Sequence, residues 1–457
     1  MARSDSTSTI PQIDSVTLEA EPRSGFTSPT PQTLSEKEEK GQKFEERSES
    51  VHDNPLSPED DFPDGGTRAW LIVVGAMCNT FATFGYANSW GVFQSYYQET
   101  ILSDSSPSNI AWIGSIQYAL IFFPGLITGR LFDLGYYHSI LITSTAILVA
   151  STFLVAQCTQ YWHFLLCQGF AVGLSCGCIF SPTAAIVSHW FKKRRGLAMG
   201  FVAVGSSIGG TVLPIATRKL ILLVGFQWTM RITGFILLGV LGVANLLLKR
   251  RLPPRNVVGG LINLSAFKSA SYTVYCLSGL VIFLGLYTLL TYVAVSAVDI
   301  GIPDDVAFYF IAFGNASSLF GRYFGGLVSD WLGPMNVMIP MTIGAGVLTY
   351  AWPFARSEAS LIVVTLIYGF FAGAYVSLVC NPIMDMGDTS DVGRRVGMFL
   401  SIMALGAVAG PPISGAIAAA TGSFVAVGVY AGSCVVVGVG LMAVSRSLVL
   451  KSLYGKL

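Results

Sequence analysis

Charged residues are scarce in this chain, and that scarcity narrows its class. Lys, Arg, Asp and Glu make up 12% of the 457 residues, whereas hydrophobic residues make up 52%. An ordinary soluble domain carries about twice this share of charge. The formal net charge is only +1, and no concentrated basic surface is available for a phosphate backbone. We therefore expect lipid to be the main solvent of this chain, and we expect no nucleic-acid partner.

Signatures of pumps and metal enzymes are missing as well. The sequence contains no Gly-x-x-x-x-Gly-Lys-Ser/Thr loop for the phosphates of ATP and no His-Glu-x-x-His helix. Its four histidines are widely scattered, and Cys176 and Cys178 lack the two-residue gap of a zinc or redox pair. We predict no enzyme activity, no cofactor and no metal site, with the cysteines serving as small core side chains.

The first 63 residues differ from the rest in composition. They are rich in Ser, Thr, Pro, Glu and Lys and hold few Ile, Leu or Val residues, so they cannot bury enough apolar surface to offset chain entropy. We predict a disordered cytoplasmic tail over residues 1–63. A solvated leader is one interpretation of it, and a site of phosphorylation or turnover is the other.

Apolar stretches long enough to cross a bilayer follow from Trp70 onward. A span of ~30 Å needs about 20 helical residues. We therefore predict an all-α membrane protein with twelve transmembrane helices. The expected spans are 68–95, 109–133, 138–157, 161–189, 195–217, 227–248, 273–298, 305–331, 335–354, 359–384, 395–420 and 424–446.

The distribution of basic residues predicts the orientation of these helices. Outside the tail and apart from Arg322, 20 Lys and Arg residues remain, and 16 of them fall on the side of the two termini. By the positive-inside rule, both termini are expected in the cytoplasm. The basic segment 249–272 is predicted to be a cytoplasmic linker against anionic lipid. It separates a six-helix bundle at 64–248 from another at 273–446, and residues 447–457 form a cytoplasmic C-terminal tail.

A pattern of Gly, Phe, Pro and Arg recurs at a constant offset of 200 residues. Repetition in the same direction indicates two pseudo-symmetric halves that arose by duplication. Transporters are built this way, because two halves that rock about a shared site expose it to each side in turn. The repeated positions are Gly169, Phe170, Gly173, Pro182, Arg194 and Arg195, answered by Gly369, Phe370, Gly373, Pro382, Arg394 and Arg395.

These features resemble the major facilitator superfamily, and within it the fungal members of the monocarboxylate-transporter-like family. The resemblance covers everything after the tail and implies the major facilitator fold with alternating access. It rests on Gly-x-x-x-Asp at 129–133 and 326–330, Asp-Gly-Gly at 64–66 before Trp70, the motif Trp-Phe-Lys-Lys-Arg-Arg-Gly-Leu-Ala-x-Gly at 190–200, and Arg322 within the eighth helix.

Two positions depart from the proton-coupled lactate carriers of that family. Where those carriers have a lysine in the first helix, this chain has Trp90, and where they have an aspartate one turn before the arginine, it has Ser318. A lactate–proton relay is therefore not expected. The tryptophan favours a bulkier ligand than lactate.

Arg322 is the sharpest candidate for a binding residue. It lies eight residues before Asp330, or about 12 Å from the end of its helix, where a guanidinium facing lipid would cost several kcal/mol. It must face the interior. Its donors suit a carboxylate, enolate or similar oxyanion, so we expect it to hold the acidic group of the substrate. The alternative is an arginine held by backbone carbonyls or by a partner carboxylate.

Polar and aromatic residues on other helices are predicted to line the same site. An apolar wall with a few polar contacts is typical of small-molecule sites, although hydrogen bonds between packed helices use the same residue types. The candidates beside Arg322 are Asn88, Trp90, Gln94, Tyr287, Thr291, Tyr375 and Asn381.

Charges at the cytoplasmic helix ends are predicted to form a gate. We expect Asp133 and Asp330 to pair with helix N-termini or with arginines across the two halves, in contacts that form only when the cytoplasmic side is closed. The alternative is that these charges anchor loops at the lipid headgroups. The partner arginines are Arg394 and Arg395 for Asp133, and Arg194 and Arg195 for Asp330.

The sequence thus predicts a secondary active transporter that moves a small organic anion across the plasma membrane. The anion is monocarboxylate-like or an acidic secondary metabolite, and proton coupling is left open. The alternatives are a membrane nutrient sensor that binds without transport and a vitamin-type, riboflavin-like uptake carrier.

Overall fold

The computed structural model describes residues 62–253, 260–387, 391–451 and 455. The chain divides into two units, Met1–Leu56 and Ser57–Leu457, and the described residues all belong to the second. The predicted tail therefore lies outside the described residues except for its last two positions. Within the described part, every regular element is a helix.

The first half of the described chain runs from Gly66 to Leu247. Its longest element, α8, contains Gly225 with φ 78°, a conformation that favours glycine. The chain turns there, so α8 consists of two helices joined at a kink. The elements are α1 (Gly66–Asn88), α2 (Trp90–Tyr96), the π-helical turn Tyr97–Ile101, α3 (Pro107–Phe122), α4 (Gly125–Asp133), α5 (Tyr137–Val155), α6 (Tyr161–Phe164), the π-helical segment Leu165–Val172, α7 (Gly173–Ser188) and α8 (Arg195–Leu247).

The second half follows the linker, which contains a short 3-10 helix at Leu264–Lys268. It comprises α9 (Ala270–Leu286), α10 (Thr288–Asp299), α11 (Asp304–Leu332), α12 (Pro334–Ala351), the 3-10 turn Trp352–Phe354, α13 (Glu358–Leu378), α14 (Asn381–Asp385), α15 (Val392–Thr421) and α16 (Phe424–Leu450).

The described helices make twelve membrane crossings. Ten helical segments are long and apolar enough to span a bilayer, and α8 counts twice because of its kink. The twelfth is α11, whose 29 residues include Arg322 and are less apolar. The predicted all-α membrane fold is confirmed. Several boundaries differ by a few residues, since the first span continues to Ile101 rather than ending near residue 95, and α16 continues to Leu450 rather than ending near residue 446.

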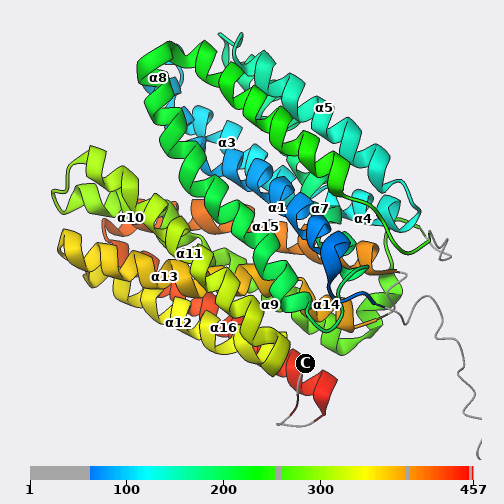
Figure 1. Cartoon of the computed structure of the whole chain (residues 1–457). Helices are drawn as coiled ribbons and strands as arrows, with labels where there is room; N and C mark the ends of the chain where they lie inside the picture. Colours follow the sequence, from blue (N-terminus) through cyan, green and yellow to red (C-terminus); the bar gives the residue numbers. More distant parts are fainter. Residues whose placement is uncertain (1–61, 254–259, 388–390, 452–454, 456–457) are drawn as a thin grey trace, which may run out of the picture. The chain divides into compact units, whose positions relative to one another are not determined.

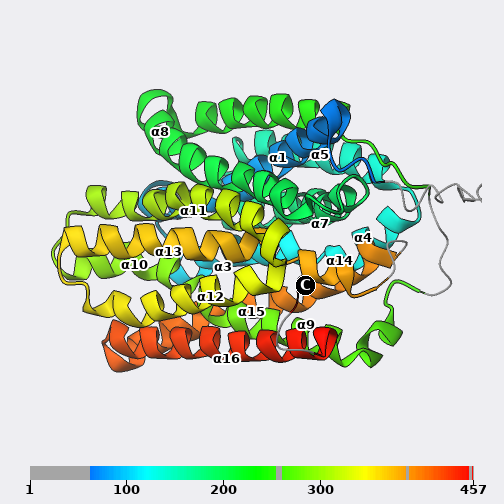
Figure 2. The same cartoon turned by 60° about the horizontal axis from the view of Figure 1, so that its bottom comes forward.

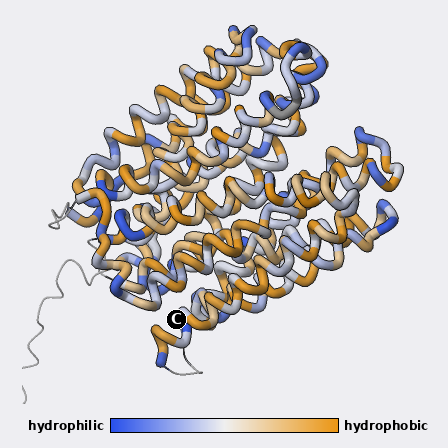
Figure 3. Tube along the Cα trace, turned by 180° about the vertical axis from the view of Figure 1, so that it is seen from behind, coloured by the Kyte–Doolittle hydropathy of each residue, from blue (hydrophilic) through white to orange (hydrophobic). Residues whose placement is uncertain are grey.

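Lipid explains why so many apolar side chains lie on the outside. Val347, Leu405 and Val437 are each more than half exposed, although they lie well inside their helices. Figure 3 shows hydrophobic colouring along the helices and hydrophilic colouring mainly near their ends. Such a surface is stable only in a bilayer, where each helix satisfies its own backbone hydrogen bonds.

Both described ends of this unit lie at the same end of the bundle. In Figure 1, α1 begins and α16 ends there, and α8 bends at the opposite end. We call these the terminus end and the far end. The two halves meet where α8 packs against α11 and where α4 packs against α15, and Figure 2 shows α8 and α11 side by side.

Candidate functional site

A cavity of about 390 Å³ lies between the two halves. Side chains from α1, α2, α3, α7 and α8 line it on one side, and side chains from α9, α10, α11, α13 and α15 line it on the other. Because both halves contribute, a rocking motion between them would change access to this space.

Arg322 contributes the one charge found among the lining residues that the structure describes. Its side chain is only 9% exposed. Nη1 donates to the carbonyl oxygen of Ala203 at 2.6 Å and to the hydroxyl of Ser206, both on α8 of the other half. Nε has no hydrogen-bond partner among the described residues. Backbone and hydroxyl contacts thus hold one end of the guanidinium and leave a buried donor at the cavity.

Aromatic rings from both halves also line the cavity. Phe84 lies 4.8 Å from Phe180 and 5.9 Å from Phe122, measured between ring centroids. Across the halves, Phe122 lies 6.1 Å from Phe283, and Tyr118 lies 5.8 Å from Tyr287. The cavity therefore combines one cationic group with a face suited to a flat, polarisable ring.

Six of the eight predicted binding residues line this cavity. Asn88 donates to the carbonyl oxygen of Phe84 at 2.7 Å, and Trp90 donates from its indole to Gln94 at 2.8 Å. These contacts orient the amides of Asn88 and Gln94, which keep further hydrogen-bonding capacity, whereas the single indole donor of Trp90 is used. The six residues are Asn88, Trp90, Gln94, Tyr287, Thr291 and Arg322.

The structure places the other two predicted residues outside the lining. Tyr375 is 1% exposed, and its ring packs 6.3 Å from that of Phe283. Asn381 is 2% exposed and begins α14. Their near neighbours Ser377 and Cys380 line the cavity instead, because successive helical residues point about 100° apart.

Several lining residues were not among the predicted binding residues. Tyr118 and Phe122 face the cavity from α3, and Asn315 and Ser318 face it from α11. The last pair was detectable, since both lie within two turns of Arg322 on one helical face. The aromatic residues gave no such signal, because a ring that faces lipid and a ring that faces a cavity look alike in sequence.

Two aspartates join the halves at the terminus end. Asp133, at the end of α4, accepts hydrogen bonds from the backbone amides of Gly393 at 3.1 Å and Arg394 at 2.9 Å. Asp330, on α11, accepts from the amides of Gly196 at 2.7 Å and Leu197 at 3.0 Å. Each carboxylate thus caps the N-terminus of a long helix in the other half, where the helix dipole favours negative charge.

The predicted arginines bind other partners. Arg394 donates from Nε to Asp391 at 2.5 Å, and Arg195 pairs with Asp385. Arg395 donates to the carbonyl oxygen of Ile383 at 2.6 Å. Arg194 is exposed, and its backbone amide donates to Asp64 at 3.2 Å. The hydrogen bonds described for Asp133 and Asp330 thus come from the backbone of these segments.

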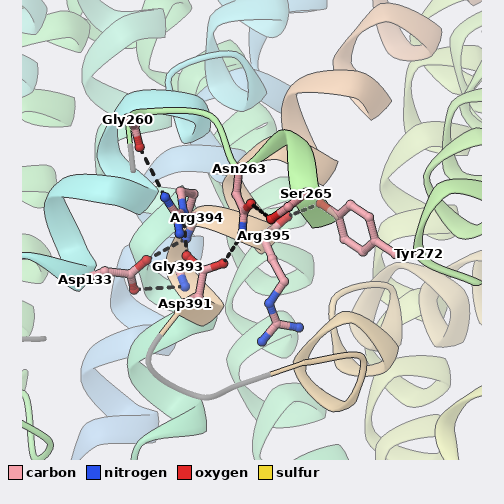
Figure 4. A network of polar contacts seen from close by, with 9 residues as sticks. All are labelled: Asp133, Gly260, Asn263, Ser265, Tyr272, Asp391, Gly393, Arg394 and Arg395. Atoms are coloured by element: carbon pink, nitrogen blue, oxygen red, sulfur yellow. Dashed lines mark hydrogen bonds and ion pairs between the residues drawn. The ribbon is translucent and has the colours of Figure 1, made fainter. Parts of the chain in front are cut away.

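The linker binds both halves beside the hydrogen bonds of Asp133 to α15. Figure 4 shows the C-terminal part of the linker there. Asn263 donates to Asp391 at 2.8 Å, and the carbonyl oxygen of Gly260 accepts from Arg394 at 3.3 Å. On the other half, Arg250 donates to the carbonyl oxygen of Phe132. Burial lowers the pKa of the Arg250 guanidinium, and the Asp133 carboxylate opposes that shift. The described part of the linker thus braces α4 and α15.

Glycines allow the close approach of the two halves here. A Cβ on Gly129 would lie 2.2 Å from the carbonyl oxygen of Gly393, and one on Gly397 would lie 2.0 Å from that of Gly125. Neither contact tolerates a side chain, so the backbones of α4 and α15 touch directly.

Within the described ranges, no group of three or more His, Cys, Asp and Glu residues could hold a metal ion. The buried His189 stands alone, with its ring 5.1 Å from that of Phe132. Burial, followed by the charges of Arg250 and Arg251, lowers its pKa to about 3. It is therefore neutral at physiological pH and contributes packing rather than charge.

Comparison with known proteins agrees with this geometry. Residues 76–357 match the family model of the Major Facilitator Superfamily. The chain is 36% identical over 413 residues to the "Aspyridones efflux protein apdF" of Emericella nidulans, covering 90% of this chain and 84% of that protein. It is 39% identical over 375 residues to the "MFS transporter asaE" of Aspergillus flavus, covering 81% and 84% respectively.

Among solved structures, the E. coli fucose:proton symporter superimposes with a TM-score of 0.66 at 16% identity, covering 82% of this chain and 99% of that one. The sequence relatives and the shared fold lead to one conclusion. The chain belongs to the major facilitator superfamily and is a multi-pass membrane transporter of small molecules, not an enzyme.

Proposed function

We propose that this transporter exports a small organic anion with an aromatic or conjugated body, such as an acidic secondary metabolite. The observation that carries the proposal is the pairing of one buried guanidinium with a wall of aromatic rings in the same cavity. A neutral ligand would leave the cation of Arg322 uncompensated at low dielectric, whereas an anion would neutralise it.

The contacts of Arg322 indicate how the anion binds. Nη1 is occupied by Ala203 and Ser206, while Nε lacks a partner among the described residues. Nε and the adjacent Nη2 form the side edge of the guanidinium, and a carboxylate or enolate can accept two parallel hydrogen bonds there. The contacts from α8 hold the group in place, so little side-chain entropy is lost when the anion binds.

The conformation supports alternating access between the two membrane faces. Asp133 and Asp330 close the terminus end by capping α15 and α8. We propose that these contacts break when the cavity opens toward that end. We also assign the terminus end to the cytoplasm, because the basic residues are concentrated at that end. We place the protein in the plasma membrane, as export from the cell requires. The two bundles at 64–248 and 273–446 are then the moving bodies.

Proton coupling through a carboxylate in the cavity has little support. Arg322 is the one ionised side chain among the described lining residues, and no Asp or Glu joins it there. Asp133, Asp330 and Asp385 engage helix ends or an arginine at the terminus end instead. We propose that the substrate itself compensates the charge of Arg322. Export is supported by the relative apdF, which is named an efflux protein.

Transport by reconstituted protein tests this proposal. Liposomes that contain the purified transporter are loaded with coumarin-3-carboxylate, and counterflow of the labelled compound is measured. The same measurement is made with coumarin-3-carboxamide, and the two are compared. We expect saturable counterflow of the carboxylate only. In Arg322→Gln the counterflow should fall by at least about 30-fold, which corresponds to a lost charge-assisted bidentate contact of ~2 kcal/mol or more.

Controls separate recognition from folding and transport from sensing. Arg218→Gln, a change near the far end, should leave carboxylate counterflow intact, and both variants should elute as the parent does on size exclusion. Equal counterflow of carboxylate and amide would overturn the anion assignment. Saturable binding without flux would identify a receptor. The natural substrate is then sought among the metabolites that accumulate inside cells from which the gene has been deleted.

A further inference from the structure

A second polar cluster lies in the cavity, apart from the guanidinium of Arg322. Asn315 stands seven residues before Arg322 on α11, and both residues line the cavity. Seven residues make nearly two full turns, so both side chains project from one face of the helix, about 10 Å apart along its axis. Because Asp330 on the same helix lies at the terminus end, Asn315 is the residue nearer to the far end.

Asn88 of the first half approaches Asn315 of the second half across Gly210 on α8. A Cβ on Gly210 would lie 3.1 Å from Nδ2 of Asn88 and 3.3 Å from Nδ2 of Asn315. The missing side chain at Gly210 thus allows the two carboxamides to converge from α1 and α11. We call Asn88 and Asn315 the amide pair.

The amide pair keeps hydrogen-bonding capacity for a ligand. Nδ2 of Asn88 donates to the carbonyl oxygen of Phe84 at 2.7 Å, and Nδ2 of Asn315 donates to that of Gly210 at 3.3 Å. Each Nδ2 carries a second hydrogen, and neither side-chain oxygen accepts a hydrogen bond from the residues that the structure describes. Asn315 is only 7% exposed, so its remaining capacity must be met inside the protein or by a ligand.

The hydroxyl between Asn315 and Arg322 is already engaged. Ser318 shares a hydrogen bond with the hydroxyl of Ser207 at 2.7 Å, and its own hydroxyl lies 2.7 Å from the carbonyl oxygen of Asn315. Unused polar capacity on this face of α11 is therefore concentrated at its two ends, at the guanidinium and at the amide pair.

A helix break beside Asn88 is a second indication of a ligand site. α1 ends at Asn88 and α2 begins at Trp90, although both belong to one span, Gly66–Ile101. Non-helical backbone at membrane depth is tolerated where it is buried in protein or lines a cavity, and transporters commonly place interrupted helices at the substrate site. The break thus holds Asn88 at a position typical of ligand contacts.

We infer, on the basis of the proposed anion site at Arg322, that the amide pair binds a neutral polar group at the opposite end of the substrate. Two carboxamides offer donors and acceptors but no charge, which matches a hydroxyl or an amide. A second carboxylate there would be buried without a counter-ion, because Arg322 is the one ionised side chain among the described lining residues. The substrate is then an elongated monoanion with polar groups about 10 Å apart at the two ends of its ring body.

Competition between matched coumarins tests this inference in the reconstituted transporter. Counterflow of labelled coumarin-3-carboxylate is inhibited with 7-(hydroxymethyl)coumarin-3-carboxylate or with 7-ethylcoumarin-3-carboxylate, which has a similar shape and no hydroxyl. Position 7 lies at the end of the ring system opposite the carboxylate. We expect the hydroxymethyl compound to inhibit at about tenfold lower concentration, as two ordinary hydrogen bonds would give. Coumarin-3,7-dicarboxylate should inhibit more weakly than either compound.

Asn315→Ala and Asn88→Ala remove the members of the amide pair one at a time. In each variant we expect the advantage of the hydroxymethyl compound to fall to about threefold or less, while the ethyl compound inhibits as it does in the parent. Asn245→Ala is the matched control and should keep the tenfold advantage. Nδ2 of Asn245 also donates to a carbonyl oxygen four residues earlier, that of Leu241 at 2.8 Å, but Asn245 is not among the lining residues.

Gly210→Ala keeps both asparagines and serves in case an alanine variant of the amide pair does not fold. Its Cβ crowds both carboxamides and should likewise lower the advantage to about threefold or less. Equal inhibition by the hydroxymethyl and ethyl compounds in the parent would overturn the inference. A tenfold advantage that persists in every folded variant of Asn88, Asn315 and Gly210 would overturn it as well.

Carboxamide analogues separate the amide pair from the anion site. Both competitors are also tested as their 3-carboxamides. If the carboxamides inhibit as strongly as the carboxylates and the hydroxymethyl group keeps its advantage, the anion assignment of Arg322 fails and the amide pair stands. If the carboxylates inhibit more strongly but the hydroxymethyl group gives no advantage, the amide pair is overturned and the anion assignment stands.

Discussion

Replacing Asp133 by Asn should release the terminus end of the transporter. The carboxylate accepts two backbone hydrogen bonds at the N-terminus of α15, a helix of 30 residues. Asparagine keeps one acceptor and points a donor at the second amide. The closed form then loses one charge-assisted hydrogen bond and the favourable interaction with the helix dipole, together worth about 2 kcal/mol. That loss raises the open population roughly 30-fold.

Thiol labelling measures this population. Ser377 lines the cavity near the terminus end of α13, and Ser377→Cys in a cysteine-free background reports access from that end. When opening is fast compared with labelling, the labelling rate follows the open population. We expect Asp133→Asn to accelerate modification by a membrane-impermeant maleimide roughly 30-fold.

Asp385→Asn is the control for this experiment. Asp385 pairs with Arg195 at the same end, but its side chain is 40% exposed, and exposed ion pairs contribute about 1 kcal/mol or less. We expect its acceleration to stay below about fivefold. Equal labelling of Asp133→Asn and its parent, or equal acceleration by both variants, would refute the gate role of Asp133.

Three further outcomes follow from the geometry. His189 is neutral in the fold with a pKa of about 3, whereas an unfolded His titrates near ~6.5. Its contribution to the free energy of unfolding is therefore complete above about pH 6.5 and falls by ~1.4 kcal/mol per pH unit down to pH 3. Thermal unfolding in detergent should depend less steeply on acid pH for His189→Gln than for the parent, and an identical dependence would contradict the assignment. Gly129→Ala should destabilise the fold by about 1–3 kcal/mol through a backbone clash. Gly242→Ala should be neutral or slightly stabilising, because a Cβ at Gly242 meets no atom within 4 Å. Equal melting temperatures for the two variants would argue against the clash. Ser206→Ala should raise the half-saturation concentration for coumarin-3-carboxylate about fivefold, because Nη1 of Arg322 loses one of its two acceptors. An unchanged concentration would show that this contact does not position the binding group.

The fold was predictable because lipid imposes it. The lengths of the apolar stretches predicted the membrane spans, and the repeat at an offset of 200 residues predicted the two halves. The kink at Gly225 agrees with the predicted break between 217 and 227. The extension of α16 to Leu450 was missed because Arg446 and the polar residues around it look like a loop, whereas Arg446 donates to Asn336 at 2.5 Å and lies within the helix.

The site was only partly predictable, because sequence gives the helix but not the angle at which it faces its neighbours. Arg322 was predicted to face the interior because a guanidinium that faces lipid is costly in a membrane. Tyr375 and Tyr287 look equivalent in sequence, yet only Tyr287 lines the cavity. The register between α8 and α11, which positions Ser206 against Arg322, depends on contacts between segments more than 100 residues apart.

The charge of Arg322 in the cavity has an electrical consequence. An arginine in a protein interior keeps its proton, so the carrier without cargo moves one positive charge through part of the membrane field as it reorients. With a monovalent anion bound, the moving site carries no net charge. A membrane potential, worth about 2.3 kcal/mol per elementary charge for each 100 mV, therefore acts on the return of the vacant transporter and leaves the loaded step nearly insensitive to voltage.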